Sequence, residues 1–248
     1  DIAILGETSA ASGVDAGYGW AGRQRHVPEL RFVNRYHDDA GYIEALARRI
    51  ETHWKEHGLP DKLVMSFHGV PERTLHLGDP YHCEARKTGR LLAERLGLRE
   101  DRYRITFQSR FGKAKWLEPY TQPTIEALGK AGTRRVDVVC PGFTSDCLET
   151  LEEIGMEVRE AFLHAGGQEF HYIPCLNDNN HWITALSRVA QQHLAGWPTE
   201  APTAAALADA RSLAGLRQQA VTDGVHVAAG PLLQPEVEVA QGQKVGDR

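Results

Sequence analysis

The stretch "LVMSFHGVPERT" (63–74) places a histidine, His68, where an apolar strand runs out into a loop. An imidazole can bind a divalent metal and can also take up a proton near neutral pH. Gly69, the next residue, is expected to leave one flank of the ring open to a ligand. The alternative interpretation is a histidine that closes the strand with a satisfied hydrogen bond, and this stretch alone does not separate the two.

A second set of chemically useful side chains lies in "PGFTSDCLETLEEIGMEVRE" (141–160). A helix that begins near Asp146 places Glu149, Glu153 and Glu157 at i, i+4 and i+8, within an arc of about 80° on one face. Such a row of like charges favours a compensating cation, and carboxylates suit Mg²⁺, Mn²⁺ or Fe²⁺. Two structural alternatives stay open. Asp146 and Glu149 match a capping-box spacing, and the later glutamates could form a solvated face.

Apolar runs and helix-period stretches alternate along the chain and would position these residues. The runs predict strands at 30–37, 62–69, 103–110, 134–142 and 170–176. The stretches between them predict helices at roughly 39–57, 80–97, 121–131, 146–165 and 180–195. This alternation predicts an α/β fold, a doubly wound parallel sheet flanked by helices.

The predicted sheet has a consequence for the site, because ligands of open α/β sheets bind outside the carboxyl ends of the strands. Residues that follow predicted strands are therefore expected to share one rim. They are His37, His68, the pair Gln108–Ser109 and the turn Pro141-Gly142-Phe143. By contrast, His53 and His57 fall on a polar helix face, where we expect them to be exposed to solvent.

Composition excludes several classes of protein. The 248 residues are 42% hydrophobic and 25% charged, enough for one large domain or two small ones. A net charge of −5 gives no electrostatic footprint for nucleic acid and no polybasic membrane patch. Four cysteines occur singly, so a disulfide framework is not expected. We therefore expect a reducing, cytoplasmic setting. The glycine motifs of nucleotide binding and the serine-hydrolase motif are absent from the sequence.

Several stretches together resemble the ferrochelatases, which insert ferrous iron into a porphyrin. They are "VPELRFVNRYHDDAGYIEALA" (27–47), "PDKLVMSFHGVPERTLHLGDPYHCE" (60–84), "YRITFQSRFGKAKWLEPYT" (103–121), "VDVVCPGFTSDCLETLEEIGMEVREAF" (136–162) and "AGGQEFHYIPCLND" (165–178). The resemblance is greatest to the proteobacterial branch, where S-F-H-G-[IV]-P and D-C-L-E-T-L-E-E-I are typical. It implies a chelatase-like Rossmann-type domain.

The resemblance implies a role for each matching residue. His68 and Glu149 would be the catalytic pair, facing each other across the porphyrin as metal ligands and proton acceptors. Glu153 and Glu157 match an acidic path that would pass metal in or protons out, which extends the metal-binding set. The helix start near Asp146 is expected to depart from α geometry, as in a π-bulge. Positions that line or support the porphyrin cleft match Gln108, Ser109, Trp116 and Phe143.

The implied reaction is the insertion of Fe²⁺ into protoporphyrin IX to form protohaem, a lyase step in haem synthesis. Fe²⁺ is then a substrate metal, and no iron–sulfur cluster is expected because Cys175 is the last cysteine. Two alternatives remain: a chelatase for another tetrapyrrole, of coproporphyrin or cobalt-precorrin type, and a non-catalytic remnant that binds porphyrin. A transient membrane contact would suit an apolar porphyrin, but no basic amphipathic stretch supports it.

The resemblance covers roughly 28–198, which we expect to be the catalytic α/β domain. Residues 1–27 are interpreted as an atypical N-terminal remnant, so that part of a second, similar domain is expected to be missing. Residues 199–248 are interpreted as a low-complexity, flexible tail. Within it, "TAAALADARSLAGLRQQA" could form a helix on propensity.

Overall fold

The computed structural model describes residues 31–197, 200–201 and 203–222. The interpretations of residues 1–27 and of the tail beyond 222 therefore lie outside the described residues. The chain divides into two compact units, Asp1–Gly196 and Trp197–Arg248. In the second unit, α8 (Ala204–Thr222) confirms the helix that propensity indicated in the tail.

The first unit is built on four parallel strands, which confirms the α/β prediction. They are β1 (Lys62–His68), β2 (Tyr103–Gln108), β3 (Arg135–Val139) and β4 (Glu169–Ile173). Their order in the sheet is β2-β1-β3-β4, and all pairs are parallel. The chain thus winds outward in both directions from the β1–β3 pair, so the topological switch point lies between these two strands.

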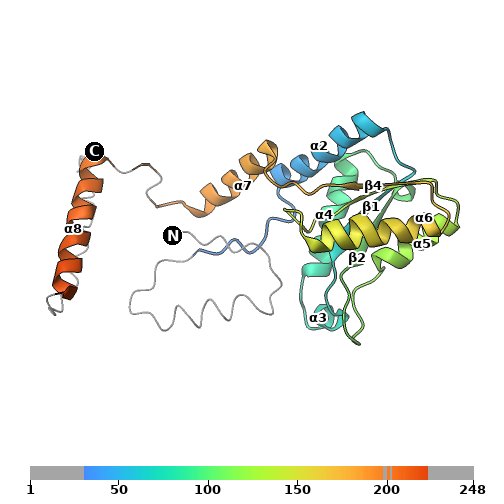
Figure 1. The fold of residues 1–248 in the computed structure, drawn as a ribbon, viewed down its shortest axis with the longest axis horizontal. Helices are drawn as coiled ribbons and strands as arrows, with labels where there is room; N and C mark the ends of the chain where they lie inside the picture. The colour runs from blue at the N-terminus through green and yellow to red at the C-terminus, as the bar shows by residue number, and fades with distance from the viewer. Residues whose placement is uncertain (1–30, 198–199, 202, 223–248) are drawn as a thin grey trace, which may run out of the picture. The chain divides into compact units, whose positions relative to one another are not determined.

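Helices cover both faces of the sheet (Figure 1). Leu63, Met65 and Phe67 of β1 belong to one hydrophobic cluster, whereas Val64 belongs to the other. The first cluster is shared with α2 (Ala40–His57), α4 (Tyr81–Arg95) and α7 (Asn180–His193). The second is shared with α5 (Thr121–Lys130), η2 (Glu149–Val158) and α6 (Arg159–His164). Because strand side chains alternate, His68 lies on the η2 face with Val64.

The predicted strand at 30–37 is wrong over its described part. Residues 31–36 form neither helix nor strand, and they run along α7. The Arg31 guanidinium donates to the carbonyls of His193 and Ala195, at 2.8 and 2.7 Å. The Tyr36 ring packs on Trp182 with centroids 5.8 Å apart. The described part of the run lies along α7 with its side chains half-buried or exposed, and it does not pair in the sheet, so His37 does not end a strand.

The remaining predicted elements agree with the structure, apart from the acidic helix. That helix begins at Glu149 instead of near Asp146, and its first ten residues form the π-helix η2, which continues into α6. A π-bulge was expected, and the observed π segment is longer. Two short elements were not predicted, α3 (Glu72–His76) and the 3₁₀ turn η1 (Glu100–Arg102).

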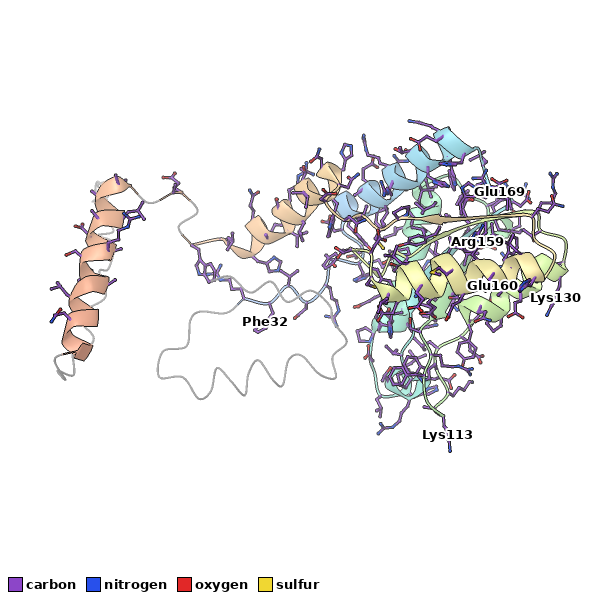
Figure 2. The ribbon with its side chains drawn as sticks, viewed as in Figure 1. Phe32, Lys113, Lys130, Arg159, Glu160 and Glu169 are labelled. Carbon is purple, nitrogen blue, oxygen red and sulfur yellow. The ribbon has the colours of Figure 1, made fainter. Side chains whose placement is uncertain are left out.

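The loop between β2 and α5 runs alongside α3, with Lys113 labelled at its tip (Figure 2). The Leu117 N–H donates to the Val70 carbonyl at 3.0 Å, and the Glu72 N–H donates to the Lys115 carbonyl at 2.9 Å. These bonds hold two loops together beyond the carboxyl ends of β1 and β2. In the described part of the chain, no helix combines the length and apolar character that a bilayer crossing requires.

Candidate functional site

His68 lies where β1 ends, opposite Gln108 in the register with β2. Its Nδ1 lies 2.5 Å from the Gly69 carbonyl oxygen. A carbonyl can only accept, so Nδ1 carries the proton of the neutral ring and Nε2 carries the lone pair. The ring lies between two aromatic side chains, with centroids 6.3 Å from Trp116 and 6.1 Å from Phe143. The imidazole is half-buried and presents a basic nitrogen at the switch point.

The expectation that Gly69 opens a flank of the imidazole is wrong. Gly69 is buried, and a Cβ there would lie 2.8 Å from the Gln108 carbonyl oxygen and 3.0 Å from Cε3 of Trp116. The Gly69 N–H also donates to that carbonyl at 2.8 Å. The missing side chain therefore lets Trp116 and the end of β2 approach β1, which positions the aromatic ring next to His68.

Glu149 is the first residue of η2, and its side chain is exposed. The Cys147 thiol donates to Glu149 Oε2 at 2.9 Å. This hydrogen bond, the residue's own backbone N–H and the nearby His68 together lower the pKa of the Glu149 carboxyl, although burial opposes them. Glu149 is thus a carboxylate at neutral pH, within electrostatic reach of the imidazole.

Gln108 joins the strands to the start of η2. Its side chain is 3% exposed, and its Oε1 accepts from the Ser66 hydroxyl at 2.7 Å. Its Nε2 donates to the Glu149 backbone carbonyl at 2.6 Å. Ser66 lies on the same face of β1 as His68. The Gln108 side-chain amide therefore connects the end of β1 to the first residue of η2, Glu149.

Ser109 holds the second glutamate of the acidic row. Its φ is +62°, a left-handed conformation that costs a residue other than glycine about 1–3 kcal/mol. In this conformation its N–H donates to Glu153 Oε1 at 2.7 Å and its hydroxyl to Oε2 at 2.6 Å. Charge-assisted hydrogen bonds of this kind offset the strain. Glu153 is thereby fixed beneath the rim.

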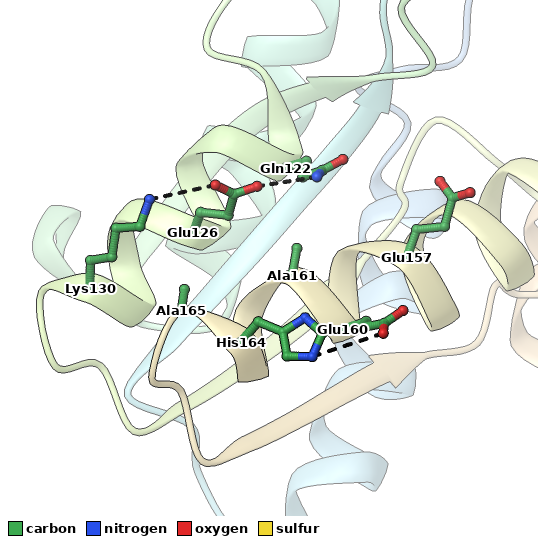
Figure 3. A pocket seen from close by; sticks show the side chains of 8 residues that line it. All are labelled: Gln122, Glu126, Lys130, Glu157, Glu160, Ala161, His164 and Ala165. Atoms are coloured by element: carbon green, nitrogen blue, oxygen red, sulfur yellow. Dashed lines mark hydrogen bonds and ion pairs between the residues drawn. The ribbon is translucent and has the colours of Figure 1, made fainter.

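Glu157 lies apart from the other two glutamates. It is exposed and lines a surface depression of about 460 Å³ between α5 and α6, together with Glu126 and Glu160 (Figure 3). Among the described residues, His68 and the three glutamates do not bring three donor atoms within 4.8 Å of one another. The acidic row is therefore spread along η2, from the rim to this depression.

The capping-box interpretation of Asp146 is wrong. Its carboxylate does not cap the helix but accepts from the Tyr172 hydroxyl and the Cys175 N–H, at 2.5 and 3.0 Å. Asn177 Nδ2 donates to its other oxygen at 2.7 Å. Burial opposes ionisation, but these donors outweigh it and hold the pKa of Asp146 below its ordinary value. Asp146 thus ties the start of η2 to the segment after β4.

Trp116 is 4% exposed and stacks edge-on against the exposed Phe111, with ring centroids 4.8 Å apart. Its indole Nε1 is buried and has no hydrogen-bond partner in the described part of the chain. A buried donor of this kind needs an acceptor, since leaving it unpaired costs free energy. The acceptor would have to come from a ligand, from water or from other residues of the protein.

The structure therefore brings most of the predicted site residues to one rim. It gathers His68, Gln108, Ser109, Trp116, Phe143, Glu149 and Glu153, and it places Glu157 further along η2. Sequence reasoning missed the Cys147 thiol as the donor to Glu149. Its position two residues before the glutamate was the available signal.

The parallel sheet flanked by helices defines the class as an α/β protein, and the imidazole and carboxylate near its switch point form the candidate site. The solved structure described as SirB from Bacillus subtilis with Fe3+ is similar, with a TM-score of 0.51 at 17% identity. The match covers 77% of this chain and 69% of SirB. At this identity, the likeness shows the fold alone.

The chain belongs to the ferrochelatase family, whose model matches residues 3–194. That range begins inside the segment 1–27, so the family match reaches nearer the start of the chain than the motif resemblance did. Ferrochelatases of Polaromonas sp. and Methylibium petroleiphilum are 69% and 68% identical, over 79% and 80% of this chain. The ferrochelatase of Aromatoleum aromaticum is 57% identical over 88%. The chain spans about half the length of these relatives: 53%, 55% and 58%.

Proposed function

We propose that this chain carries the catalytic pair of a ferrochelatase that inserts Fe²⁺ into protoporphyrin IX to form protohaem. The observation that supports the proposal is that His68 ends β1 at the switch point while Gln108, its partner in β2, binds the Glu149 backbone carbonyl at 2.6 Å. Family membership supplies the reaction class. The proposal keeps the cytoplasmic setting expected from the spacing of the cysteines in the sequence.

The chemistry requires two pyrrole protons to leave the macrocycle as the metal enters. In the proposed reaction, His68 Nε2 accepts one of these protons, because its lone pair is available while Nδ1–H is turned to the Gly69 carbonyl. The second proton would leave to solvent by way of the η2 carboxylates. Glu149, ionised and exposed, holds iron on the other side of the ring. Phe143 and Trp116 flank the imidazole and would contact the apolar macrocycle. Binding of the periphery would offset ring distortion of about 1–5 kcal/mol.

Gln108 and Ser109 act in this proposal by positioning the acidic helix, since their polar atoms are bonded to Glu149 and Glu153. The family resemblance gave Gln108 and Ser109 a role in lining or supporting the porphyrin cleft, and in this proposal they support it. Glu153 and Glu157 form a route along η2 for metal or protons. The depression beside Glu157 would be its outer end.

The experiment is anaerobic Fe²⁺ insertion by the 248-residue chain, followed by the change in porphyrin absorbance. The wild-type chain is expected to metallate protoporphyrin IX, and a His68→Ala variant to lose the activity. Faster turnover of coproporphyrin or of a cobalt-precorrin would favour the other-tetrapyrrole alternative. A chain that binds porphyrin without metallating it would establish the non-catalytic remnant instead.

A further inference from the structure

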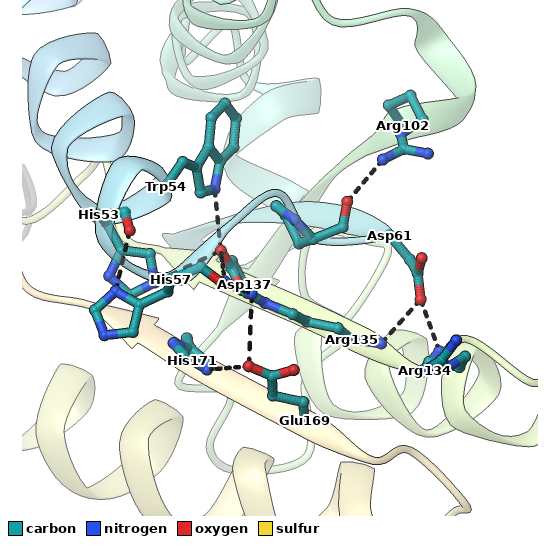
Figure 4. Close-up of polar contacts among 11 residues, drawn as sticks. His53, Trp54, His57, Asp61, Arg102, Arg134, Arg135, Asp137, Glu169 and His171 are labelled. Carbon is teal, nitrogen blue, oxygen red and sulfur yellow. Dashed lines mark hydrogen bonds and ion pairs between the residues drawn. The ribbon is translucent and has the colours of Figure 1, made fainter.

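A cluster of three histidines lies on the opposite face of the sheet from the rim. His53 and His57 are one turn apart at the end of α2, and His171 lies in β4 (Figure 4). One donor atom from each lies within 4.8 Å of the other two, and no other trio of potential ligand residues does so in the described part of the chain. We propose that His53, His57 and His171 form a binding site for a borderline divalent cation of the Zn²⁺ class, separate from the chelation site.

The cluster is distant from the rim. His171 pairs with Asp137 of β3, which in turn pairs with Leu63 of β1. Five residues of strand separate Leu63 from His68, or about 16 Å at the rise of a parallel strand. Alternation also places Asp137 and His171 on the α2 face, whereas His68 lies on the η2 face. A cation held here is therefore not one in transit at the catalytic pair.

Each imidazole has one ring nitrogen directed at an oxygen. His57 Nδ1 lies 3.0 Å from the His53 carbonyl, and His171 Nε2 lies 2.7 Å from Glu169 Oε1. His53 Nε2 is buried without a hydrogen bond in the described residues and lies 3.6 Å from Asp137 Oδ2. Metal-bound histidines characteristically donate their second N–H to such a carbonyl or carboxylate, which fixes the tautomer. The remaining nitrogen of each ring is then available to a metal.

The surrounding charges favour a cation. Asp137 is fully buried and bonded to the Arg135 guanidinium and the Trp54 indole, and Glu169 lies 3.5 Å from Arg135 Nη1. Two carboxylates thus face one guanidinium. The cluster also lies at the carboxyl end of α2, where the helix dipole is negative. Burial lowers the pKa of His53 and keeps it neutral, as a metal ligand must be.

The geometry requires one imidazole to turn. A tetrahedral zinc site with bonds of about 2.05 Å places its nitrogen atoms about 3.3 Å apart. The His53 and His57 rings are stacked with centroids 4.3 Å apart, and His171 meets both edge-on at 5.1 and 4.9 Å. Because the lone pairs lie in the ring planes, the His57 ring must rotate out of the stack before both nitrogens can face one ion, and its exposure leaves room for this. Three imidazoles leave a fourth position for water, and borderline ions such as Zn²⁺ and Co²⁺ favour such a set.

The test uses the full chain carrying His68→Ala and Glu149→Gln, so that the rim cannot supply the binding and failure of the proposed function does not affect the outcome. Titration with Zn²⁺ against a chromophoric chelator is expected to show one ion per chain. Adding His171→Gln or His57→Gln should weaken binding at least tenfold, whereas His181→Gln, an exposed histidine outside the cluster, should not. Co²⁺ should give the visible absorption of a four-coordinate site, which Zn²⁺ abolishes.

A second measurement uses the unmodified wild-type chain and avoids any variant that fails to fold. Zn²⁺ should protect His53, His57 and His171 from diethyl pyrocarbonate, while His181 and His164 continue to react. The proposal is overturned if the rim-deficient chain binds no Zn²⁺, if affinity is unchanged by His171→Gln, or if the three histidines react equally with and without the ion.

Discussion

The polar residues on the two faces of the sheet differ in their hydrogen bonding. On the η2 face, Ser66, Gln108 and Ser109 are linked to Glu149 and Glu153 by hydrogen bonds of 2.6–2.7 Å. On the α2 face, three imidazoles gather around a buried carboxylate, and His53 Nε2 is left without a hydrogen bond there. Both faces bring polar groups together. The η2 face ties the Glu149 backbone and the Glu153 carboxylate to the end of β2, whereas the α2 face fixes the Asp137 carboxylate and leaves an imidazole nitrogen unpaired among the described residues.

In the two proposals, this difference separates an exchanging metal from a resident ion. One exposed carboxylate and one imidazole offer few ligands, so a borderline cation held by them is expected to be released readily. Three imidazoles are expected to bind it more strongly, because they supply three nitrogen donors that suit borderline cations. On the η2 face, single substitutions can remove each supporting interaction in turn.

Among variants of the η2 helix, the largest effect is expected for Glu149→Gln, which keeps the shape of the side chain but removes the charge proposed to hold iron. The rate of iron insertion should fall about a hundredfold, within the range typical of a positioned acid or base. Glu152→Gln, three residues further along η2 and also exposed, is the matched control and should stay within about twofold. Equal losses in the two variants would show that only the net charge of the helix matters.

Asp146→Asn is expected to lower the free energy of unfolding by about 2 kcal/mol, because three hydrogen bonds to a charged acceptor are weakened. The folded pKa of Asp146 lies below its unfolded value of about 3.9. Its contribution is therefore present above that value and is lost as pH falls through the folded pKa.

Urea unfolding measures this effect at neutral pH and at about pH 3, where the gap between wild type and Asp146→Asn should narrow. Exposed Asp178→Asn serves as the control and should unfold like the wild type at both. If the difference in free energy of unfolding between wild type and Asp146→Asn did not change with pH, the charge of Asp146 would not contribute to stability.

The strain at Ser109 can be separated from its hydrogen bonds by two variants. Ser109→Ala loses the hydroxyl donor and keeps the left-handed backbone, so we expect it to be about 1–2 kcal/mol less stable. Ser109→Gly also loses the donor, but it relieves the strain and should lie closer to the wild type. Thermal unfolding would distinguish them, and a glycine variant less stable than the alanine variant would contradict the assignment of strain.

The smallest effect is expected at Cys147, through the pKa of Glu149. Removing the thiol in Cys147→Ala raises that pKa, so the acid limb of the rate–pH profile should move to higher pH. Cys147→Ser keeps a donor and should keep the profile. Identical rate–pH profiles in the alanine and serine variants would contradict the claim that a donor at position 147 lowers the pKa of Glu149.

Local patterns predicted most of the framework. The strands were found because their Val-, Ile- and Phe-rich runs are buried on both faces, and His68 and Gln108 follow from where those runs end. The run predicted at 30–37 has the same local pattern, but its described residues 31–37 lie along α7. No local signal distinguishes a run that packs along a helix from one that pairs in a sheet.

The rest depended on contacts distant in sequence. Asp146 is drawn to Tyr172 and Asn177, which prevents it from capping a helix and moves the helix start to Glu149. His53 was expected to be exposed, but only 12% of its side chain is, because it packs beside Asp137 of β3. A sequence pattern along α2 contains no information about that strand.

The most direct test of the central claim is whether His68 acts as the proton acceptor of metal insertion. Anaerobic Fe²⁺ insertion by His68→Ala should fall at least about a hundredfold, and free imidazole should restore part of the rate. Free imidazole should not rescue Glu149→Gln, because that variant has lost the proposed metal ligand but still has its base, His68. A His68→Ala chain that inserts iron within about twofold of the wild-type rate would contradict the account.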